Sequence, residues 1–275
     1  MTDTAYAPLQ SLDLSGKVAL VTGASRGIGA ATARLLAAYG ATVIAASRTL
    51  ADVEAVAKDI GGGASAAELD VADYTSVERA AQAAVDTHGS LDIWVNNAGT
   101  IAPQKLMWET DPQAWAQGST INVVGVYNGL RAALPHMIAQ KSGVVVNLSS
   151  GAANSALPGW SQYCSSKAAA KRLTEVAQRE LRENGHASEA GEGVRVVGLS
   201  PGTVATDMMA SIRDAKINVV SNLDWSKHIR PEWAAEGVAY LCGPEGTRYA
   251  GTDFSIKTPE GRAAVGLPQE GAPDA

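Results

Sequence analysis

The feature of this sequence that most restricts its fold is an alternation of short apolar runs with longer Ala-rich runs. The apolar runs contain few polar residues, as a sheet covered on both faces requires. Strands separated by helices imply right-handed crossovers and a parallel sheet. We therefore predict an α/β fold, a Rossmann-like doubly wound parallel sheet of about seven strands with helices on both faces. The expected strands are residues 17–22, 41–46, 65–70, 91–95, 143–149, 194–199 and 252–256.

The organisation of the chain is simple, because no low-complexity linker and no internal repeat divides it. We predict one domain over residues 1–275, with an extended lead-in over 1–14 and a polar surface loop over 183–193. Residues 205–230 mix Met, Trp, Asn and charged residues without a clean period, and we expect them to form a lid. Residues 257–275 are rich in Gly, Pro and Ala, and we expect a C-terminal extension that ends in a mobile tail.

Composition and charge exclude several classes of partner. The net charge is −6 and no basic tract is present, which argues against nucleic acid. The apolar uncharged run Leu35 to Ser47 is too short to span a bilayer, and the N-terminus does not resemble a targeting segment. Two cysteines make no disulfide framework, so we expect a cytoplasmic protein without a membrane or metal partner.

A glycine-rich loop follows the first expected strand and opens a helix. Glycines at this place allow a tight turn and close approach of a phosphate to the backbone. The free amides and the helix dipole favour a pyrophosphate there. The sequence therefore predicts a dinucleotide site, and the expected contacts are Gly23, Ser25, Arg26, Gly27, Ile28 and Gly29.

The end of the second strand indicates which dinucleotide is preferred. A fold that selects NAD usually carries an acid there, which binds the ribose 2′-hydroxyl. This chain has Ser47 and Arg48 instead. Arg48 and Arg26 could converge on a 2′-phosphate, so we expect NADPH rather than NADH. The alternative is two solvated surface arginines.

Tyr163 and Lys167 lie four residues apart in a stretch that reads as a helix, and they therefore share one helical face. A surface lysine beside a half-buried tyrosine would explain the pair. The other interpretation is an acid–base pair, in which the cation lowers the pKa of the phenol toward neutral pH.

The motifs together decide between these interpretations, because the chain resembles a short-chain dehydrogenase/reductase from about Leu14 to Ser255. The resemblance rests on "TGASRGIG" (22–29), "NNAG" (96–99), "STINVVG", "NLSS" (147–150), "YCSSK" (163–167) and "PGTVAT" (201–206), in the family's order and spacing. It implies that the protein is an enzyme, and it makes a silent dinucleotide sensor, our non-enzymatic alternative, a poor fit.

The resemblance implies a role for each matched residue. Tyr163 would be the general acid in carbonyl reduction, Ser150 would polarise the substrate oxygen, and Lys167 would bind the nicotinamide ribose. Asn122 would hold a water in a proton relay behind Lys167. The remaining expected cofactor contacts are Asp70 and Val71 at the adenine, Asn97, Ala98 and Gly99 at its ribose, and Pro201, Gly202, Val204 and Thr206 at the nicotinamide and pyrophosphate.

Two departures from the family affect the expected assembly. The 183–193 loop is longer than usual, and the C-terminus lacks the Gly-Gly ending of the last strand. The family's usual assembly is a tetramer, and its C-terminal region often packs across the tetramer axis. Because that region differs here, we expect a homo-oligomer that is either a tetramer or a dimer.

The substrate is indicated only by class. The expected pocket is mostly apolar, with adaptable methionines. It suits a neutral, hydrophobic ketone or the corresponding alcohol, and the alternative is a 3-oxoacyl thioester. The expected pocket residues are Ile101, Ala152, Leu157, Trp160, Met208 and Met209, with Pro158, Ile212 and Trp225 nearby.

Overall fold

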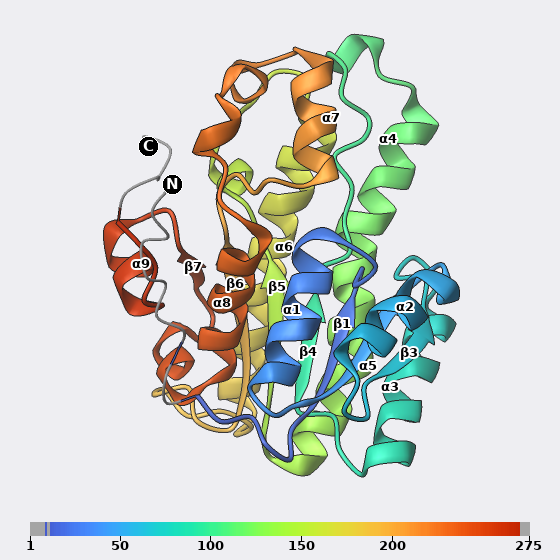
Figure 1. The fold of residues 1–275 in the computed structure, drawn as a ribbon, viewed down its shortest axis with the longest axis vertical. Coiled ribbons are helices and arrows are strands. Elements are labelled where there is room, and N and C mark those ends of the chain that lie inside the picture. The colour runs from blue at the N-terminus through green and yellow to red at the C-terminus, as the bar shows by residue number, and fades with distance from the viewer. Residues whose placement is uncertain (1–8, 10–11, 270–275) are drawn as a thin grey trace.

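The computed structural model describes residue 9 and residues 12–269. Its centre is a 7-stranded sheet in the order β3-β2-β1-β4-β5-β6-β7, and every neighbouring pair of strands is parallel (Figure 1). This confirms the predicted doubly wound fold. The strands are β1 Val18–Thr22, β2 Thr42–Ser47, β3 Ser65–Glu68, β4 Ile93–Asn96, β5 Gly143–Leu148, β6 Val194–Ser200 and β7 Asp253–Ser255.

Helices cover both faces of the sheet, as the crossover connections require. One face carries α1 (Gly27–Ala38), α2 (Leu50–Ile60) and α8 (Pro231–Cys242), and the other carries α3 (Tyr74–His88), α5 (Gly125–Gln140) and α6 (Ser161–Glu183). Three further helices are α4 (Pro112–Ser119), α7 (Asp207–Ala215) and α9 (Pro259–Ala264). Within the described residues, no helix is both long and apolar enough to cross a membrane.

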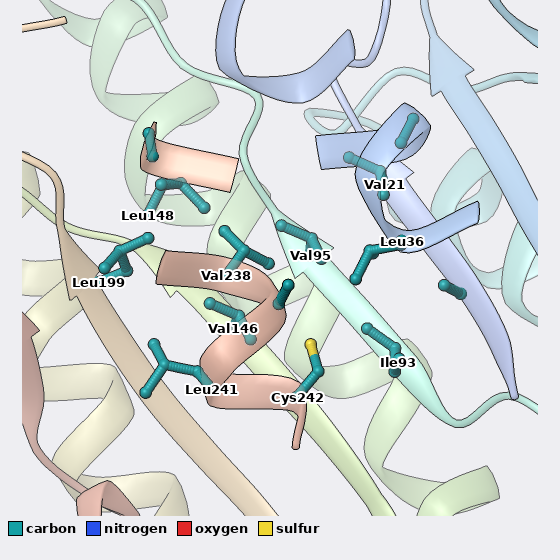
Figure 2. Close-up of a cluster of buried hydrophobic side chains, with 14 of the residues drawn as sticks. Val21, Leu36, Ile93, Val95, Val146, Leu148, Leu199, Val238, Leu241 and Cys242 are labelled. Atoms are coloured by element: carbon teal, nitrogen blue, oxygen red, sulfur yellow. The ribbon is translucent and has the colours of Figure 1, made fainter. Parts of the chain in front are cut away.

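The two faces are separated by the alternation of side chains along each strand. Ala19 and Val21 of β1 belong to the cluster under α1 and α8, whereas Val18 and Leu20 belong to the cluster under α3, α5 and α6. Figure 2 shows part of the first cluster, in which Val238 of α8 lies over the sheet. Burial on both faces is the reason that these strands are apolar at nearly every position.

The strand order reverses at β1, because β2 and β3 lie on one side of it and β4 to β7 lie on the other. In such sheets a ligand binds beyond the carboxyl ends of the strands, at the point where the strand order reverses. Helices α4 and α7 extend past this edge of the sheet (Figure 1). The fold therefore places the ends of β1, β4, β5 and β6 around one candidate site.

The C-terminal extension is more firmly packed than its composition suggested. Arg262 of α9 is 2% exposed, lies over the ring of Trp233 and donates a hydrogen bond of 2.9 Å to the carbonyl of Pro268. Val265 and Leu267 join the cluster under α8. These few apolar side chains anchor the extension as far as residue 269. The mobile tail expected at its end and most of the lead-in over 1–14 lie outside the described residues.

Candidate active site

The glycine loop forms a cradle at the start of α1. Gly23 and Gly27 have φ values of 64° and 55°, a conformation that favours glycine. A Cβ on Gly23 would lie 2.9 Å from the Cα of Ala98, so the loop also needs a residue without a side chain there. No side chain caps the first turn of α1, and its amides are free to bind an anion. This cradle fits the pyrophosphate of a dinucleotide.

Asn97 braces this loop from the end of β4. Its side-chain amide donates hydrogen bonds to the carbonyls of Thr22 (2.9 Å) and Gly23 (3.1 Å). The Thr22 hydroxyl in turn accepts hydrogen bonds from the backbone N–H groups of Asn97 (3.0 Å) and Ala98 (3.2 Å). The sequence assigned Asn97 and Ala98 to the adenine ribose. The structure places them beside the loop, where Asn97 also fixes the loop's shape.

The residues expected at the adenine follow β3. Asp70 accepts a hydrogen bond of 3.0 Å from the N–H of Ala72, within a local turn. Val71 is buried, and its carbonyl accepts a hydrogen bond of 2.8 Å from the side chain of Asn128. The N-cap of α3 is Asp73 rather than Asp70. Asp70 therefore shapes a turn at the edge of the site, next to the buried Val71.

The two arginines expected to share a 2′-phosphate have different surroundings. Arg26 forms an ion pair of 3.2 Å with Asp207, the first residue of α7, and both side chains are largely exposed. Arg48 is exposed at the end of β2, beside Ser47, whose hydroxyl donates to the carbonyl of Thr49. Arg26 is thus engaged with α7 in this structure, and Arg48 is the more available cation at the end of β2.

Tyr163, Lys167 and Ser150 come together at the carboxyl end of β5. Lys167 is 7% exposed, and its Nζ donates a hydrogen bond of 2.6 Å to the carbonyl of Leu148. The same Nζ lies 5.6 Å from the centre of the Tyr163 ring. Ser150 directly follows this strand end, and its Oγ accepts a hydrogen bond of 3.2 Å from the N–H of Ala152. The α6 helix and the strand thereby hold an acid, a cation and a hydroxyl in one place.

Burial controls the acidity of the pair. Burial raises the pKa of Tyr163 to about 12, and a hydrogen bond with the Ser150 hydroxyl opposes this shift. Burial lowers the pKa of Lys167 to about 8, and the negative charge of Asp253 opposes that shift. The expected lowering of the Tyr163 pKa was wrong for this structure, because desolvation disfavours the phenolate more than the hydrogen bond with Ser150 favours it. Tyr163 therefore holds its proton at neutral pH.

Asn122 lies in a π-helical turn, Thr120–Val124, that joins α4 to α5. Its side chain is 1% exposed, donates to the carbonyl of Thr100 (2.7 Å) and accepts from the N–H of the same residue (2.8 Å). A Cβ on Gly99 would lie 3.2 Å from Asn122 Oδ1 and 4.0 Å from Lys167 Nζ. Asn122 therefore holds the loop after β4 against Lys167, which is the neighbourhood that the relay role requires.

A buried polar chain beneath the site was missed by the sequence analysis. Asn96 of β4 donates to Asn147 of β5 (2.8 Å), and Asn147 donates to the hydroxyl of Thr174 on α6 (2.9 Å). The indole of Trp94 donates to Asn96 at 2.7 Å. Polar residues inside otherwise apolar strands were the signal that could have revealed this chain. It ties β4, β5 and α6 together directly under the reactive side chains.

The expected substrate pocket appears as one apolar cluster beyond the sheet. The buried members are Ile101, Ala152, Trp160, Met209 and Ile212, and the partly buried members packed against them include Leu157, Tyr163, Cys164 and Met208. All six expected pocket residues are therefore brought together beside Tyr163. Trp225 does not join them, since it packs against His228 and under Arg213. Pro158 contributes its carbonyl, which accepts a hydrogen bond from Asn218.

The segment after β6 connects this cluster with the glycine loop. Pro201 and Val204 are buried, and Gly202 has a φ of 81°. Thr206 precedes α7, and its methyl carbon would lie 3.2 Å from a Cβ on Gly27. Residues expected at the nicotinamide thus lie between the glycine loop and the apolar cluster, on the path along which a dinucleotide would extend.

The two ends of the segment that follows are held together. The N–H of Ile229 donates to the carbonyl of Thr203 (3.0 Å), and the N–H of Ala205 donates to the carbonyl of Ile229 (2.9 Å). We call these two hydrogen bonds the stem. Between its ends lie α7 and two short 3₁₀ turns, Val219–Asn222 and Trp225–Lys227. In the described residues, no three His, Cys, Asp or Glu side chains are grouped as metal ligands.

Comparison with known proteins agrees with this geometry. The family description "short chain dehydrogenase" matches residues 17–217. The chain is 31% identical to a 3-oxoacyl-(acyl-carrier-protein) reductase of Thermotoga maritima, over 88% of this chain and 97% of that protein. It is 35% identical to a cis-4-hydroxycyclohexanecarboxylate dehydrogenase of Sinomonas cyclohexanicum, over 87% of this chain and 94% of that protein.

Solved structures are similar over most of the chain. A 3-ketoacyl-(acyl-carrier-protein) reductase from Brucella melitensis, complexed with NADH, has a TM-score of 0.75 at 29% identity, and the match covers 89% of this chain and 98% of that one. A xylitol dehydrogenase bound to NAD⁺ has a TM-score of 0.80 at 26% identity, and the match covers 88% of this chain and 98% of that one.

Proposed function

The chain belongs to the short-chain dehydrogenase family, whose members are NAD(P)-dependent oxidoreductases, and we propose that it reduces a neutral, largely hydrophobic ketone to a secondary alcohol with NADPH. The observation that carries this proposal is the meeting of Tyr163, Lys167 and Ser150 between a dinucleotide-shaped cradle and an apolar cluster. The same site would catalyse the reverse oxidation.

The reaction requires a proton donor and a stabilised oxygen. The nicotinamide cofactor supplies the hydride when it is bound, and the carbonyl oxygen of the substrate then gains negative charge. Tyr163 is protonated at neutral pH and donates its proton to that oxygen. The Ser150 hydroxyl donates a hydrogen bond to the same oxygen and stabilises the charge as it develops. Lys167 offsets the charge of the phenolate that remains.

The residues of the cofactor side fit a dinucleotide. The free amides at the start of α1 would hold the pyrophosphate, and Lys167 would bind the nicotinamide ribose in place of the Leu148 carbonyl. NADPH is supported by Ser47 and Arg48 at the end of β2, where no carboxylate is present to repel a 2′-phosphate. Two of the similar solved structures hold NADH or NAD⁺, which makes NADH the alternative cofactor for this chain.

A 3-oxoacyl thioester is the second candidate substrate. It is favoured by similarity to reductases of 3-oxoacyl-(acyl-carrier-protein), one from Thermotoga maritima and one from Vibrio harveyi at 32% identity. The net charge of −6 weighs against docking of an acidic carrier protein. The apolar cluster can accept the acyl chain of a free thioester as readily as a hydrophobic ketone.

We also propose a homo-oligomer located in the cytoplasm. Val124 and Tyr127 near the start of α5 and Val176 on α6 are exposed apolar side chains that a second copy would cover. Both cysteines are free, which suits a reducing compartment. Light scattering at increasing protein concentration tests the assembly, and a monomer at every concentration would contradict it.

The activity is tested by mixing the protein with NADPH and a panel of ketones and acyl thioesters. Consumption of NADPH, followed by its absorbance, identifies the substrate class. The same panel with NADH measures the cofactor preference. Turnover of thioesters but not of simple ketones would favour the second candidate, and no turnover with any member would contradict both.

A further inference from the structure

Trp160 has an indole N–H without a hydrogen-bond partner among the described residues. The residue lies immediately before α6 and is 4% exposed. Its neighbours in the apolar cluster, including Ile101, Met209 and Ile212, offer no acceptor from their side chains. Burying a donor without a partner is unfavourable, so its retention needs an explanation.

An unpaired indole alone does not indicate a binding site, because the N–H of Trp233 also finds no partner in the part of the chain that the structure describes. Trp233 lies on α8 beneath Arg262, and it belongs to the cluster on the sheet rather than to the apolar cluster at Tyr163. Trp160 differs from Trp233 because it contacts the proposed proton donor, Tyr163. Its ring meets the ring of Tyr163 edge to face, with centres 5.7 Å apart and an angle of 81° between the planes.

The cover over Trp160 comes from the segment that we expect to move. Met209 and Ile212 belong to α7, and Met208 packs against the same cluster. A substrate that enters when α7 withdraws would occupy the space between this helix and Tyr163. The Trp160 ring, which contacts the Tyr163 ring, would then border that space.

We propose that the indole N–H of Trp160 donates a hydrogen bond to a second oxygen of the substrate, close along the carbon chain to the carbonyl that is reduced. This inference rests on the proposed ketone reduction and deepens it. The substrate class is a ketone with a neighbouring carbonyl or ester oxygen, rather than a simple alkyl ketone. Trp160 is thus a residue that determines specificity, and Tyr163 and Ser150 act on the reacting oxygen.

A matched pair of substrates tests the proposal. Ethyl 3-oxobutanoate carries a second carbonyl, and 2-heptanone has the same chain length without it. The wild-type protein should have the higher kcat/KM for the ester. Trp160→Phe removes the N–H and keeps an aromatic ring, and it should reduce the ratio of the two kcat/KM values roughly tenfold. Trp233→Phe is the control, since it removes an unpaired N–H elsewhere and should leave the ratio unchanged.

Two results would contradict the inference. An unchanged ratio in Trp160→Phe would overturn the proposal, whether both kcat/KM values fall equally, which would show a packing role, or neither falls. Failure of the wild-type protein to reduce either ketone with NADPH or NADH would remove the proposed function and the inference with it.

A second measurement observes the Trp160 indole of the wild-type protein directly and uses the variant only to assign its signal. In ¹⁵N-labelled wild-type protein, the indole proton signal of Trp160 is identified by its absence from Trp160→Phe. It should shift downfield when NADP⁺ and ethyl 3-hydroxybutanoate are bound, as a new hydrogen bond requires. An unchanged signal in this complex would overturn the proposal.

Discussion

Arg26 in the glycine loop forms an ion pair with Asp207, the first residue of α7, at a distance of 3.2 Å. The pair joins the part of the site that would hold phosphate to the segment that covers the apolar cluster. Exposed pairs of this kind contribute little to stability. The pair nevertheless couples two parts of the site. A cofactor phosphate would compete with Asp207 for Arg26, and a movement of α7 would carry Asp207 away from Arg26.

The first prediction concerns that movement. We expect residues 205–230 to close over the site when cofactor and substrate are bound, because closure excludes water from the reacting atoms. Amide hydrogen exchange of this segment should slow in the complex with NADP⁺ and an alcohol product. The neighbouring β6 serves as an internal control, since its exchange should change little. Equal exchange of residues 205–230 in the free and bound protein would argue against a lid.

The second prediction concerns the cofactor. Arg48→Ala should raise the KM for NADPH by about tenfold and leave the KM for NADH nearly unchanged, because only NADPH has a 2′-phosphate for a guanidinium to bind. Ser47→Asp should shift the preference toward NADH, since a carboxylate repels that phosphate. Steady-state kinetics with both cofactors measures these changes. If the wild-type protein uses both cofactors equally well, Arg48 does not select between them.

The third prediction concerns the proton donor. Tyr163→Phe removes the acid with little change in packing and should lower kcat by about 10²–10⁴-fold. Cofactor binding, measured by fluorescence titration, should be retained, because Lys167 and the glycine loop are intact. A variant that reduces ketones at nearly the wild-type rate would show that another group donates the proton.

The fourth prediction concerns pH. Burial lowers the pKa of Lys167 to about 8, whereas the pKa of Tyr163 is raised to about 12. As the pH rises above about 8, Lys167 loses its charge first, while Tyr163 keeps its proton. The kcat/KM for NADPH should therefore be level near pH 7 and fall about tenfold per pH unit well above pH 8. Lys167→Arg keeps a cation, and its lower activity should lack this fall. A wild-type profile that stays level to pH 10 would contradict the assignment.

The fifth prediction concerns stability. Glu236 on α8 is fully buried, accepts a hydrogen bond of 2.9 Å from the Tyr39 hydroxyl, and has a pKa that burial raises to about 7. Its ordinary pKa is 4.5, so the folded protein binds the extra proton between pH 4.5 and 7. The free energy of unfolding should therefore fall as the pH rises through this range.

Glu236→Gln should remove that dependence. The variant should be more stable than the wild type by about 2–3 kcal/mol at pH 8, and the difference should be much smaller at pH 5. Urea unfolding at the two pH values measures this difference. Glu54→Gln, at an exposed position on α2, is the control and should change the free energy little. A difference between Glu236→Gln and the wild type that is the same at both pH values would contradict the prediction.

The fold could be predicted from the sequence, because each strand is marked by its own short apolar run. Each apolar run lies in or next to a strand, since strands buried on both faces leave little room for polar residues. The exact ends of the strands were predicted less well. The third strand ends at Glu68 rather than at Asp70, because the chain turns there around the Asp70 side chain. The order of the strands was not predicted, because the crossover rule gives the handedness of each connection and does not say which strands are neighbours.

The sequence predicted which residues meet in the site, but it did not predict their pKa shifts or ion pairs. The motifs placed Tyr163 and Lys167 on one helical face, and the structure keeps them close. The direction of the tyrosine pKa shift was wrong, because burial depends on residues that are distant in the sequence. The partner of Arg26 was missed for the same reason, since Asp207 lies far along the chain. Sequence motifs identify side chains, whereas their charges depend on what surrounds them.

The stem formed by Thr203, Ala205 and Ile229 has a consequence for how this protein acquires new specificities. Residues 206–228 leave the sheet and return to it at one point, closed by two backbone hydrogen bonds that need no particular side chain. A replacement of that segment by one of another length would preserve the same entry and exit. The α7 side of the apolar cluster can therefore be exchanged, by evolution or by a designer, without rebuilding the residues of the hydride chemistry.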